Sequence, residues 1–277
     1  MNRAPQSPSA DDVLVVHTSD LHLGSEIHGG DGSGQESLAW LRAVLASAQQ
    51  AQLLLVAGDM FDNNRLSASL LEAATSLLAE ANLQIVILPG NHDPLTPDSV
   101  YRRGPFADAP NVSVLGLSGR GSAIFPEWSV EVWGRAHRSY SDMPPFADPP
   151  QRTTRWQIAL AHGHYEEAGS SPVDHAWRPS WRFRSEDLAA TNADYVALGH
   201  WERAVGVGGG KARAYYSGSP DLAGTVNVVR LGGDGGVRVG RHPLFAANRP
   251  TWTAPDLRPS GGSASSSLTM GGSPWPG

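Results

Sequence analysis

The chain has 277 residues, of which 40% are hydrophobic and 17% are charged, and this composition predicts a folded domain with a substantial core. Because the chain has no cysteine, disulfides and thiolate metal sites are excluded, and only nitrogen and oxygen atoms remain as protein ligands for a metal ion. The formal net charge of -6 excludes a global basic field for nucleic acid, and the absence of any membrane-length apolar run or signal-peptide core leads us to expect a cytoplasmic protein.

Three short apolar runs follow a predicted flexible leader, residues 1–12. Runs of four or five apolar residues between polar clusters are typical of strands buried on both faces of a parallel sheet. The runs are Val13–His17, Leu53–Ala57 and Ile85–Leu88. Between them, apolar residues spaced three and four apart predict two helices, Gln35–Ala51 and a second helix capped by Ser67. This alternation predicts that the domain begins with a right-handed parallel sheet.

Apolar runs in the second half of the chain predict further strands, which are separated by longer loops. The candidates are Val112–Leu115, Val130–Trp133, Trp156–Ala161, Tyr195–Leu198, Ala214–Ser217, Val226–Leu231 and Val237–His242. We expect the last three to be antiparallel, with a glycine-rich hairpin over residues 232–236. Acidic residues after Ser185 predict a short helix there. Residues 246–277 lack any apolar period, so we predict one domain over residues 13–245 and a disordered tail.

Polar clusters follow five of these strands at their carboxyl ends. In an open parallel sheet, ligands bind at those ends, so we expect the clusters to converge on one crevice. Their carboxylate, amide and imidazole groups suit Mn²⁺, Fe, Zn²⁺ or Mg²⁺. The candidate metal ligands are Asp20, His22, Asp59, Asn91, His162, His200 and Glu202.

The order of the strands suggests how these ligands are shared. A two-metal centre needs a carboxylate between ions that lie roughly 3.5–4 Å apart, and Asp59 is the candidate because its strand lies between the other two. Asp20 and His22 would then hold one ion, and Asn91 with His162 would hold the other. Such a pair activates water for phosphoryl transfer.

Two further residues of the third cluster are candidate catalytic groups. His92 follows a candidate ligand directly and is not needed as a ligand itself. It is therefore a candidate to protonate the leaving oxygen or to stabilise the transition state, with Asp93 orienting its ring.

The complete set of motifs resembles that of the calcineurin-like metallophosphoesterases. The motifs are Asp20-Leu-His22, Gly58-Asp-Met-Phe-Asp62, Gly90-Asn-His-Asp93, His162 and Gly199-His-Trp-Glu202. Their surroundings resemble more specifically the bacterial SbcD-type DNA repair exonucleases, over about residues 13 to 245. The resemblance implies an α/β fold, a four-layer α-β-β-α sandwich with mixed sheets, and a di-metal phosphoesterase that often uses Mn²⁺.

The resemblance also implies a role for each residue that matches a motif. One ion would be held by Asp20, His22, Asp59 and residue 202. The other ion would be held by Asp59, Asn91, His162 and His200, with His92 acting on the phosphate.

The sequence departs from this family pattern in two places. The last motif of the family usually ends in a second histidine, where this chain has Glu202, whose extra negative charge should weaken the ion as a Lewis acid. The nucleases also carry a DNA-capping domain and helices that grip an ATPase after this core. Because this chain continues into a Gly- and Ser-rich tail, we do not expect an ATPase partner, whereas a homodimer is left open.

Three functions are compatible with these observations. The leading hypothesis is hydrolysis of phosphodiesters in nucleic acid, with single-stranded or duplex-end DNA as candidate substrates. The first alternative is a phosphodiesterase or phosphatase that acts on a small nucleotide or another metabolite. The second alternative is an inactive scaffold that binds proteins, and only Glu202 favours it.

The shape and charge of the rim around the site should distinguish a polymer substrate from a small molecule. Asn64, Arg65 and His164 lie close to motifs and are candidate substrate contacts. An open groove lined by arginines and tryptophans would favour a polymer, whereas a closed pocket would favour a small molecule. The candidate groove residues are Trp177, Arg178, Trp181, Arg182 and Arg184, and the alternative is that the tryptophans pack on the domain while the arginines are solvated.

Overall fold

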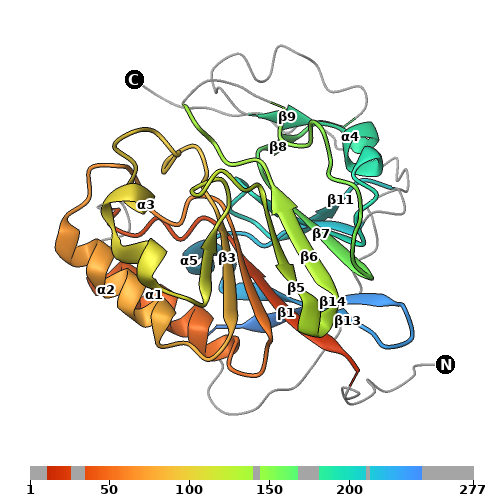
Figure 1. Cartoon of the computed structure of the whole chain (residues 1–277), viewed down its shortest axis with the longest axis horizontal. Helices are drawn as coiled ribbons and strands as arrows, with labels where there is room; N and C mark the ends of the chain where they lie inside the picture. Colours follow the sequence, from red (N-terminus) through yellow and green to blue (C-terminus); the bar gives the residue numbers. More distant parts are fainter. Residues whose placement is uncertain (1–10, 26–34, 140–143, 168–180, 210–212, 245–277) are drawn as a thin grey trace, which may run out of the picture.

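In the computed structural model, two six-stranded sheets pack face to face (Figure 1). The structure describes residues 11–25, 35–139, 144–167, 181–209 and 213–244. The predicted leader up to residue 10 and the predicted tail from residue 245 onward therefore lie outside the described residues.

The first sheet has the strand order β14-β13-β1-β2-β3-β4, and its centre is the predicted parallel unit. The parallel strands are β1 (Val13–Thr18), β2 (Leu53–Ala57), β3 (Gln84–Leu88) and β4 (Val112–Val114). Two crossover helices, α1 (Gln35–Ser47) and α2 (Ala68–Ala79), cover its outer face (Figure 1). Ser67 caps α2, since its Oγ accepts a hydrogen bond from the backbone N–H of Leu70 at 3.3 Å. The prediction for the first helix was too long at its carboxyl end, where residues 48–50 form a turn.

The end of the domain returns to this first sheet. The strands β13 (Thr225–Leu231) and β14 (Val237–Pro243) form the predicted hairpin, and β13 pairs antiparallel with β1. On β13, the Nε of Arg230 donates a hydrogen bond to Asp12 Oδ2 at 2.6 Å. The predicted extent of the leader, residues 1–12, was therefore too long, because Asp12 is already tied to the sheet.

The second sheet has the strand order β11-β12-β10-β7-β6-β5. Its strands are β5 (Ser122–Phe125), β6 (Val130–Gly134), β7 (Trp156–His162), β10 (Tyr195–Gly199), β11 (Val205–Val207) and β12 (Arg213–Tyr216). The prediction that the strand near Ala214 is antiparallel to its neighbours was wrong in part, because β12 runs parallel to β10. The antiparallel neighbour of β12 is instead β11. This strand has too few apolar residues to be predicted from the sequence.

A small layer covers the outer face of the second sheet. It consists of α4 (Ser185–Ala190) and a two-stranded sheet formed by β8 (His164–Tyr165) and β9 (Arg182–Phe183). Phe183 and Leu188 of this layer pack on outward-facing residues of the sheet, including Val196 and Leu198. The four layers agree with the predicted sandwich, although the fourth layer is thin. In the described ranges, no helix has both the length and the apolar content needed to cross a membrane.

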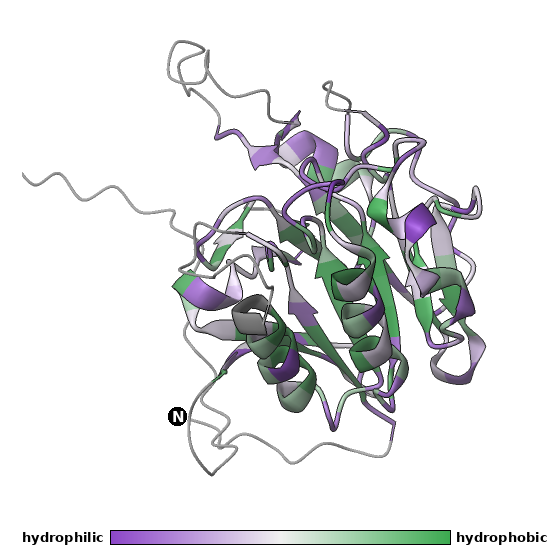
Figure 2. Ribbon diagram, turned by 90° about the vertical axis from the view of Figure 1, so that its left-hand side faces the viewer, coloured by the Kyte–Doolittle hydropathy of each residue, from purple (hydrophilic) through white to green (hydrophobic). Residues whose placement is uncertain are grey.

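The central strands are buried on both faces, which explains their continuous apolar sequences. On β10, Tyr195 and Ala197 face the core between the sheets, whereas Val196 and Leu198 face the outer layer. Figure 2 shows these hydrophobic strands in the interior, behind helices of mixed character. The remaining helical segments are short: α3 (Val100–Arg103), α5 (Pro220–Ala223) and two 3₁₀ turns, Pro105–Asp108 and Pro126–Trp128.

Candidate metal centre

The carboxyl ends of five strands, from both sheets, meet at one edge of the sandwich. Within the first sheet, the backbone N–H of Asp20 donates to the carbonyl of Gly58 at 3.1 Å. Between the sheets, His162 Nδ1 lies 2.9 Å from the carbonyl oxygen of Ala57, and the backbone N–H of His200 donates to the carboxylate of Asp20. These contacts bring together residues that are up to 180 positions apart in the sequence.

The most buried part of the centre surrounds His162 and Asp59. The Nε2 atom of His162 lies 3.0 Å from Asp59 Oδ2 and 3.0 Å from Asn91 Oδ1. Because the carbonyl of Ala57 can only accept, Nδ1 carries the proton, and Nε2 of the neutral ring faces two oxygens with a lone pair. Three acceptor atoms face one another in this arrangement, so it requires either an extra proton or a cation. The donor set therefore fits a divalent metal ion.

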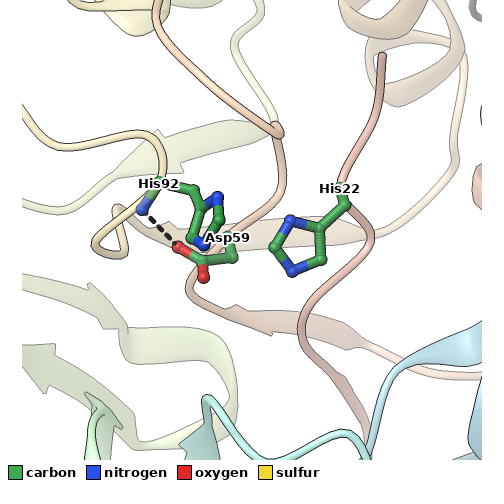
Figure 3. A group of neighbouring side chains, drawn as sticks. All are labelled: His22, Asp59 and His92. Atoms are coloured by element: carbon green, nitrogen blue, oxygen red, sulfur yellow. Dashed lines mark hydrogen bonds between the residues drawn. The ribbon is translucent and has the colours of Figure 1, made fainter. Parts of the chain in front are cut away.

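A second group overlaps the first at Asp59. The ligand atoms of His22, Asp59 and His92 lie within 4.8 Å of one another, and so do those of Asp20, Asp59 and His162. Figure 3 shows the rings of His22 and His92 beside the Asp59 carboxylate, and their centroids are 4.7 Å apart. A carboxylate shared by two groups is what a bridging ligand requires, although the bridging role of Asp59 stays a prediction.

The charges of the centre favour a bound cation. Burial alone would raise the pKa of Asp59, but the neighbouring ring of His162 lowers it, so Asp59 is ionised. Burial would lower the pKa of His162, but the charges of Asp59 and Asp20 raise it to about 9. The pKa of His22 also rises to about 9, because the neighbouring carboxylates of Asp62, Asp59 and Asp20 outweigh burial. Because the pKa values of these two rings are raised, a metal ion would bind there in competition with protons.

Several of the predicted ligands have a strained backbone. Asp20, His22, Asp59 and His200 have φ angles of 54°, 45°, 49° and 101°, in the left-handed region that residues with a Cβ rarely adopt. Each such residue costs about 1–3 kcal/mol, and this kind of strain concentrates at functional sites.

Two motif glycines make the close approach of these loops possible. A Cβ atom at Gly58 would overlap the ring of His162, and a Cβ atom at Gly90 would overlap the carboxylate of Asp59. The fold therefore needs glycine at both positions to hold the ligands at these distances.

Asp93 does not orient the ring of His92, so this prediction was wrong. Its buried carboxylate accepts hydrogen bonds from the N–H groups of Phe61 and Gly90, at 3.0 Å and 2.7 Å, and from the hydroxyl of Tyr101 at 2.6 Å. Asp93 therefore joins the second and third motif loops beneath the centre. The ring of His92 instead has its Nδ1 3.0 Å from the carbonyl oxygen of Asp62, while its backbone N–H donates to Asp59 Oδ1.

The candidate substrate contacts have different environments. Asn64 is buried and bonds to Pro94, Thr96 and Val100, so its predicted place on the substrate rim was wrong. Arg65 is exposed, and its substrate role stays a prediction. His164 lies near the centre, with its ring centroid 6.3 Å from that of His200, but its Nδ1 accepts a hydrogen bond from Trp201.

The predicted arginine groove is described only in part. Trp177 and Arg178 lie outside the described residues. Arg182 and Arg184 both lie 3.3 Å from the carboxylate of Glu166, which offsets part of their positive charge. Trp181 is buried, as the packing alternative expected.

The side chain of Glu202 is exposed. Among the described residues, neither group of potential metal ligands includes Glu202, and neither includes His200, whose ring centroid nevertheless lies 5.3 Å from that of His162. The carbonyl oxygen of Glu202 accepts a hydrogen bond from the N–H of Ser219 at 3.1 Å.

His137 contributes to the centre, although no sequence pattern pointed to it. Its Nε2 donates to the carbonyl of His162 at 3.0 Å. Its backbone N–H donates to Pro89 and its carbonyl accepts from Leu95, on either side of the third motif. One residue thus joins the loops that carry Asn91 and His162.

Comparisons with known proteins agree with this geometry. Residues 13–203 match the family model described as calcineurin-like phosphoesterase. The chain is 28% identical to the SbcD component of the SbcCD nuclease of Rhodobacter capsulatus, over 75% of this chain and 62% of that protein. It is 27% identical to the uncharacterized metallophosphoesterase YhaO of Bacillus subtilis, over 68% of this chain and 48% of that protein. The chain therefore spans about three-fifths, or less, of the length of these relatives.

A solved structure has the same fold. The crystal structure of TT1561 of Thermus thermophilus superposes with a TM-score of 0.53 and 13% identity, over 84% of this chain and 99% of that chain. At this level of identity the similarity concerns the fold alone, and it supports the predicted metallo-dependent phosphatase sandwich.

Proposed function

The chain belongs to the calcineurin-like phosphoesterase family, and on this premise we propose that it hydrolyses phosphodiester bonds with two divalent cations. When bound, such a pair of cations activates water and stabilises both the entering and the leaving oxygen. The proposed ligands are Asp20, His22, Asp59, Asn91, His162 and His200.

One observation carries this proposal. The Nε2 atom of His162 and the oxygens of Asp59 and Asn91 converge at 3.0 Å with no hydrogen-bond donor between them when the ring is neutral. Such a cluster of acceptors is unstable unless a proton or a cation lies within it. We propose Mn²⁺ as the physiological cation, with Fe, Zn²⁺ and Mg²⁺ as alternatives, because all of these ions accept carboxylate and imidazole ligands.

His92 is the proposed catalytic acid. Its Nδ1–H donates to the carbonyl of Asp62, which leaves Nε2 without this bond, and His92 belongs to the group formed with His22 and Asp59. The ring is also exposed, so a substrate can reach it. A proton on Nε2 would pass to the leaving oxygen as its bond to phosphorus breaks.

Nucleic acid is the proposed substrate class, as the names of the SbcCD relatives suggest. A small nucleotide or metabolite is the second candidate, and one observation favours it. Arg182 and Arg184 pair with Glu166, so they offer less charge to a polymer backbone.

A side-by-side assay tests the proposal. We would measure Mn²⁺-dependent hydrolysis of bis(p-nitrophenyl) phosphate, p-nitrophenyl phosphate and single-stranded DNA. Asp59→Asn should lower each observed rate by more than about 100-fold, because it weakens a ligand of both ions directly. The control Asp108→Asn, at an exposed position outside the centre, should match the wild type. Inactivity of the wild type towards all three substrates, or full activity of Asp59→Asn, would refute the proposal.

A further inference from the structure

We infer that His137 is a positioning residue of the metal centre: it sets the spacing between Asn91 and His162, and thereby the affinity of the cation that these two residues help to hold. His137 lies in none of the family motifs, and in the described part of the chain neither group of potential metal ligands includes it. The inference rests on the proposed function and concerns how the ligands are held before a cation binds.

Asn91 and His162 need a third residue to hold them in place. They follow β3 of the first sheet and β7 of the second sheet, so no strand pairing sets the distance between them. Asn91 Oδ1 and His162 Nε2 lie 3.0 Å apart. Both atoms are acceptors when the ring has the neutral, Nδ1-protonated form that metal binding requires. This contact therefore does not hold the pair together before a cation binds.

His137 connects the segments that carry the two ligands. Its backbone N–H donates to the carbonyl of Pro89 at 3.2 Å, and its carbonyl accepts from the N–H of Leu95 at 2.7 Å. These two bonds enclose the third motif loop, which carries Asn91. The ring reaches the other segment, because its Nε2 donates to the carbonyl of His162 at 3.0 Å. His137 therefore ties the backbone of one ligand to the loop of the other.

The ring of His137 is held firmly in this position. It is 2% exposed, the ring of Trp181 stacks against it, and the ring of His162 meets it edge-on with 5.6 Å between the centroids. Its Nδ1 atom is buried and has no hydrogen-bond partner within the described ranges. A buried nitrogen without a partner is unfavourable, and an apolar side chain would avoid it. The bond from Nε2 to His162 is therefore the contact that accounts for a histidine at this position.

A substitution at this position removes the side-chain bond and keeps the backbone bonds. The bonds to Pro89 and Leu95 use backbone atoms of residue 137, so only the bond to His162 depends on the side chain. Glutamine carries an N–H donor at about the reach of the histidine Nε2, whereas asparagine carries the same amide one methylene shorter, and methionine has the length without a donor. The informative variants are therefore His137→Gln, His137→Asn and His137→Met.

Calorimetric titration of the metal-free full chain with Mn²⁺ tests the inference without relying on activity. His137→Met and His137→Asn should bind Mn²⁺ about 10–100-fold more weakly than the wild type, which is the usual loss when a partner that orients a metal ligand is removed. His137→Gln should recover most of the affinity, because its amide can donate to the same carbonyl. In hydrolysis of bis(p-nitrophenyl) phosphate, the deficit of His137→Met should shrink as the Mn²⁺ concentration rises.

Asn111→Leu is the matched structural control. The amide of Asn111 donates to the carbonyls of Leu78, Ala81 and Leu83, at 2.9 Å, 3.0 Å and 3.2 Å. It also ties chain segments together, but it does so before β3 and β4 begin, at the end of the sheet opposite to the metal centre. Its loss should lower the free energy of unfolding in urea and leave the Mn²⁺ affinity at the wild-type level.

The outcomes distinguish a positioning role from general stability and from the proposed function. Wild-type affinity in His137→Met and His137→Asn would overturn the inference, and so would an equal loss of affinity in Asn111→Leu or a His137→Gln that binds no better than His137→Asn. If His137→Met does not fold, the comparison of the glutamine and asparagine variants decides. The expected affinities without hydrolysis of any phosphate ester would support the inference and overturn the proposed function, whereas normal hydrolysis with unchanged affinities would do the reverse.

Discussion

The hydrogen bonds of Asp93 predict a large effect for Asp93→Ala. The carboxylate is fully buried and accepts from the N–H groups of Phe61 and Gly90 and from the hydroxyl of Tyr101. Phe61 belongs to the second motif loop and Gly90 to the third. Removal of the carboxylate therefore leaves three buried donors without an acceptor and releases both loops that carry metal ligands.

The expected loss of unfolding free energy follows from these contacts. Each buried donor left without a partner costs about 1–3 kcal/mol, which gives about 3–9 kcal/mol for three donors. Two effects reduce this sum. Water can enter the space and accept from the donors. In addition, burial and the charge of Asp59 raise the pKa of Asp93 to about 6, so its removal relieves an unfavourable charge near neutral pH. We expect a loss of about 3–5 kcal/mol, a large share of a typical total of about 5–15 kcal/mol.

Urea unfolding of the metal-free protein, followed by circular dichroism, measures this loss. Tyr101→Phe is the matched variant, because it removes one of the three donors and keeps the carboxylate. It should cost about 1.5–3 kcal/mol, as expected for one hydrogen bond to a charged group. Titration of the folded Asp93→Ala protein with Mn²⁺ should also show weaker binding, since Asp59 and Asn91 lie on the two loops that it joins.

A different pattern would refute this reasoning. If Asp93→Ala loses no more unfolding free energy than Tyr101→Phe, the carboxylate does not hold the loops together. If stability and metal affinity stay at the wild-type level while only the pH profile of hydrolysis changes, Asp93 acts on His92 instead.

Two further predictions concern the metal centre. Gly90→Ala should abolish tight Mn²⁺ binding, because its Cβ would overlap the Asp59 carboxylate, whereas Gly209→Ala, which meets nothing within 4 Å, should bind as the wild type does; equal calorimetric affinities would contradict this. Mn²⁺ affinity should rise from neutral pH to about 9 and then level off, because the raised pKa values of His22 and His162 mean that each ion displaces protons. Calorimetry in buffers of different ionisation enthalpy counts these protons, and a pH-independent affinity would argue against the protonated rings.

Much of the architecture was predictable from local sequence patterns. Apolar runs such as Leu53–Ala57 identify strands because a strand buried on both faces needs apolar side chains at every position. Ser67 identified the start of α2 because a cap is a short-range hydrogen bond. Asp20 and Asp59 each follow a strand of the parallel sheet, and they lie together at one edge of it, as their positions in the sequence predicted.

Other features depended on contacts between distant segments. β12 could not be placed from sequence, because its direction depends on β11, a three-residue strand without an apolar run. Asn64 lies beside a motif, yet it bonds to Pro94 and Val100 on another loop. The position of Asn64 next to a motif in the sequence therefore did not predict which residues its side chain contacts.

By itself, the sequence determined the order of the strands around Asp59 and the polar residues that follow them, because periodicity and strand-end position are local properties of the chain. Only the tertiary structure decided where each side chain points. It turned Asp93 away from His92 and left Glu202 in solvent, because loop conformation at a sheet edge is set by hydrogen bonds to residues far away in the chain.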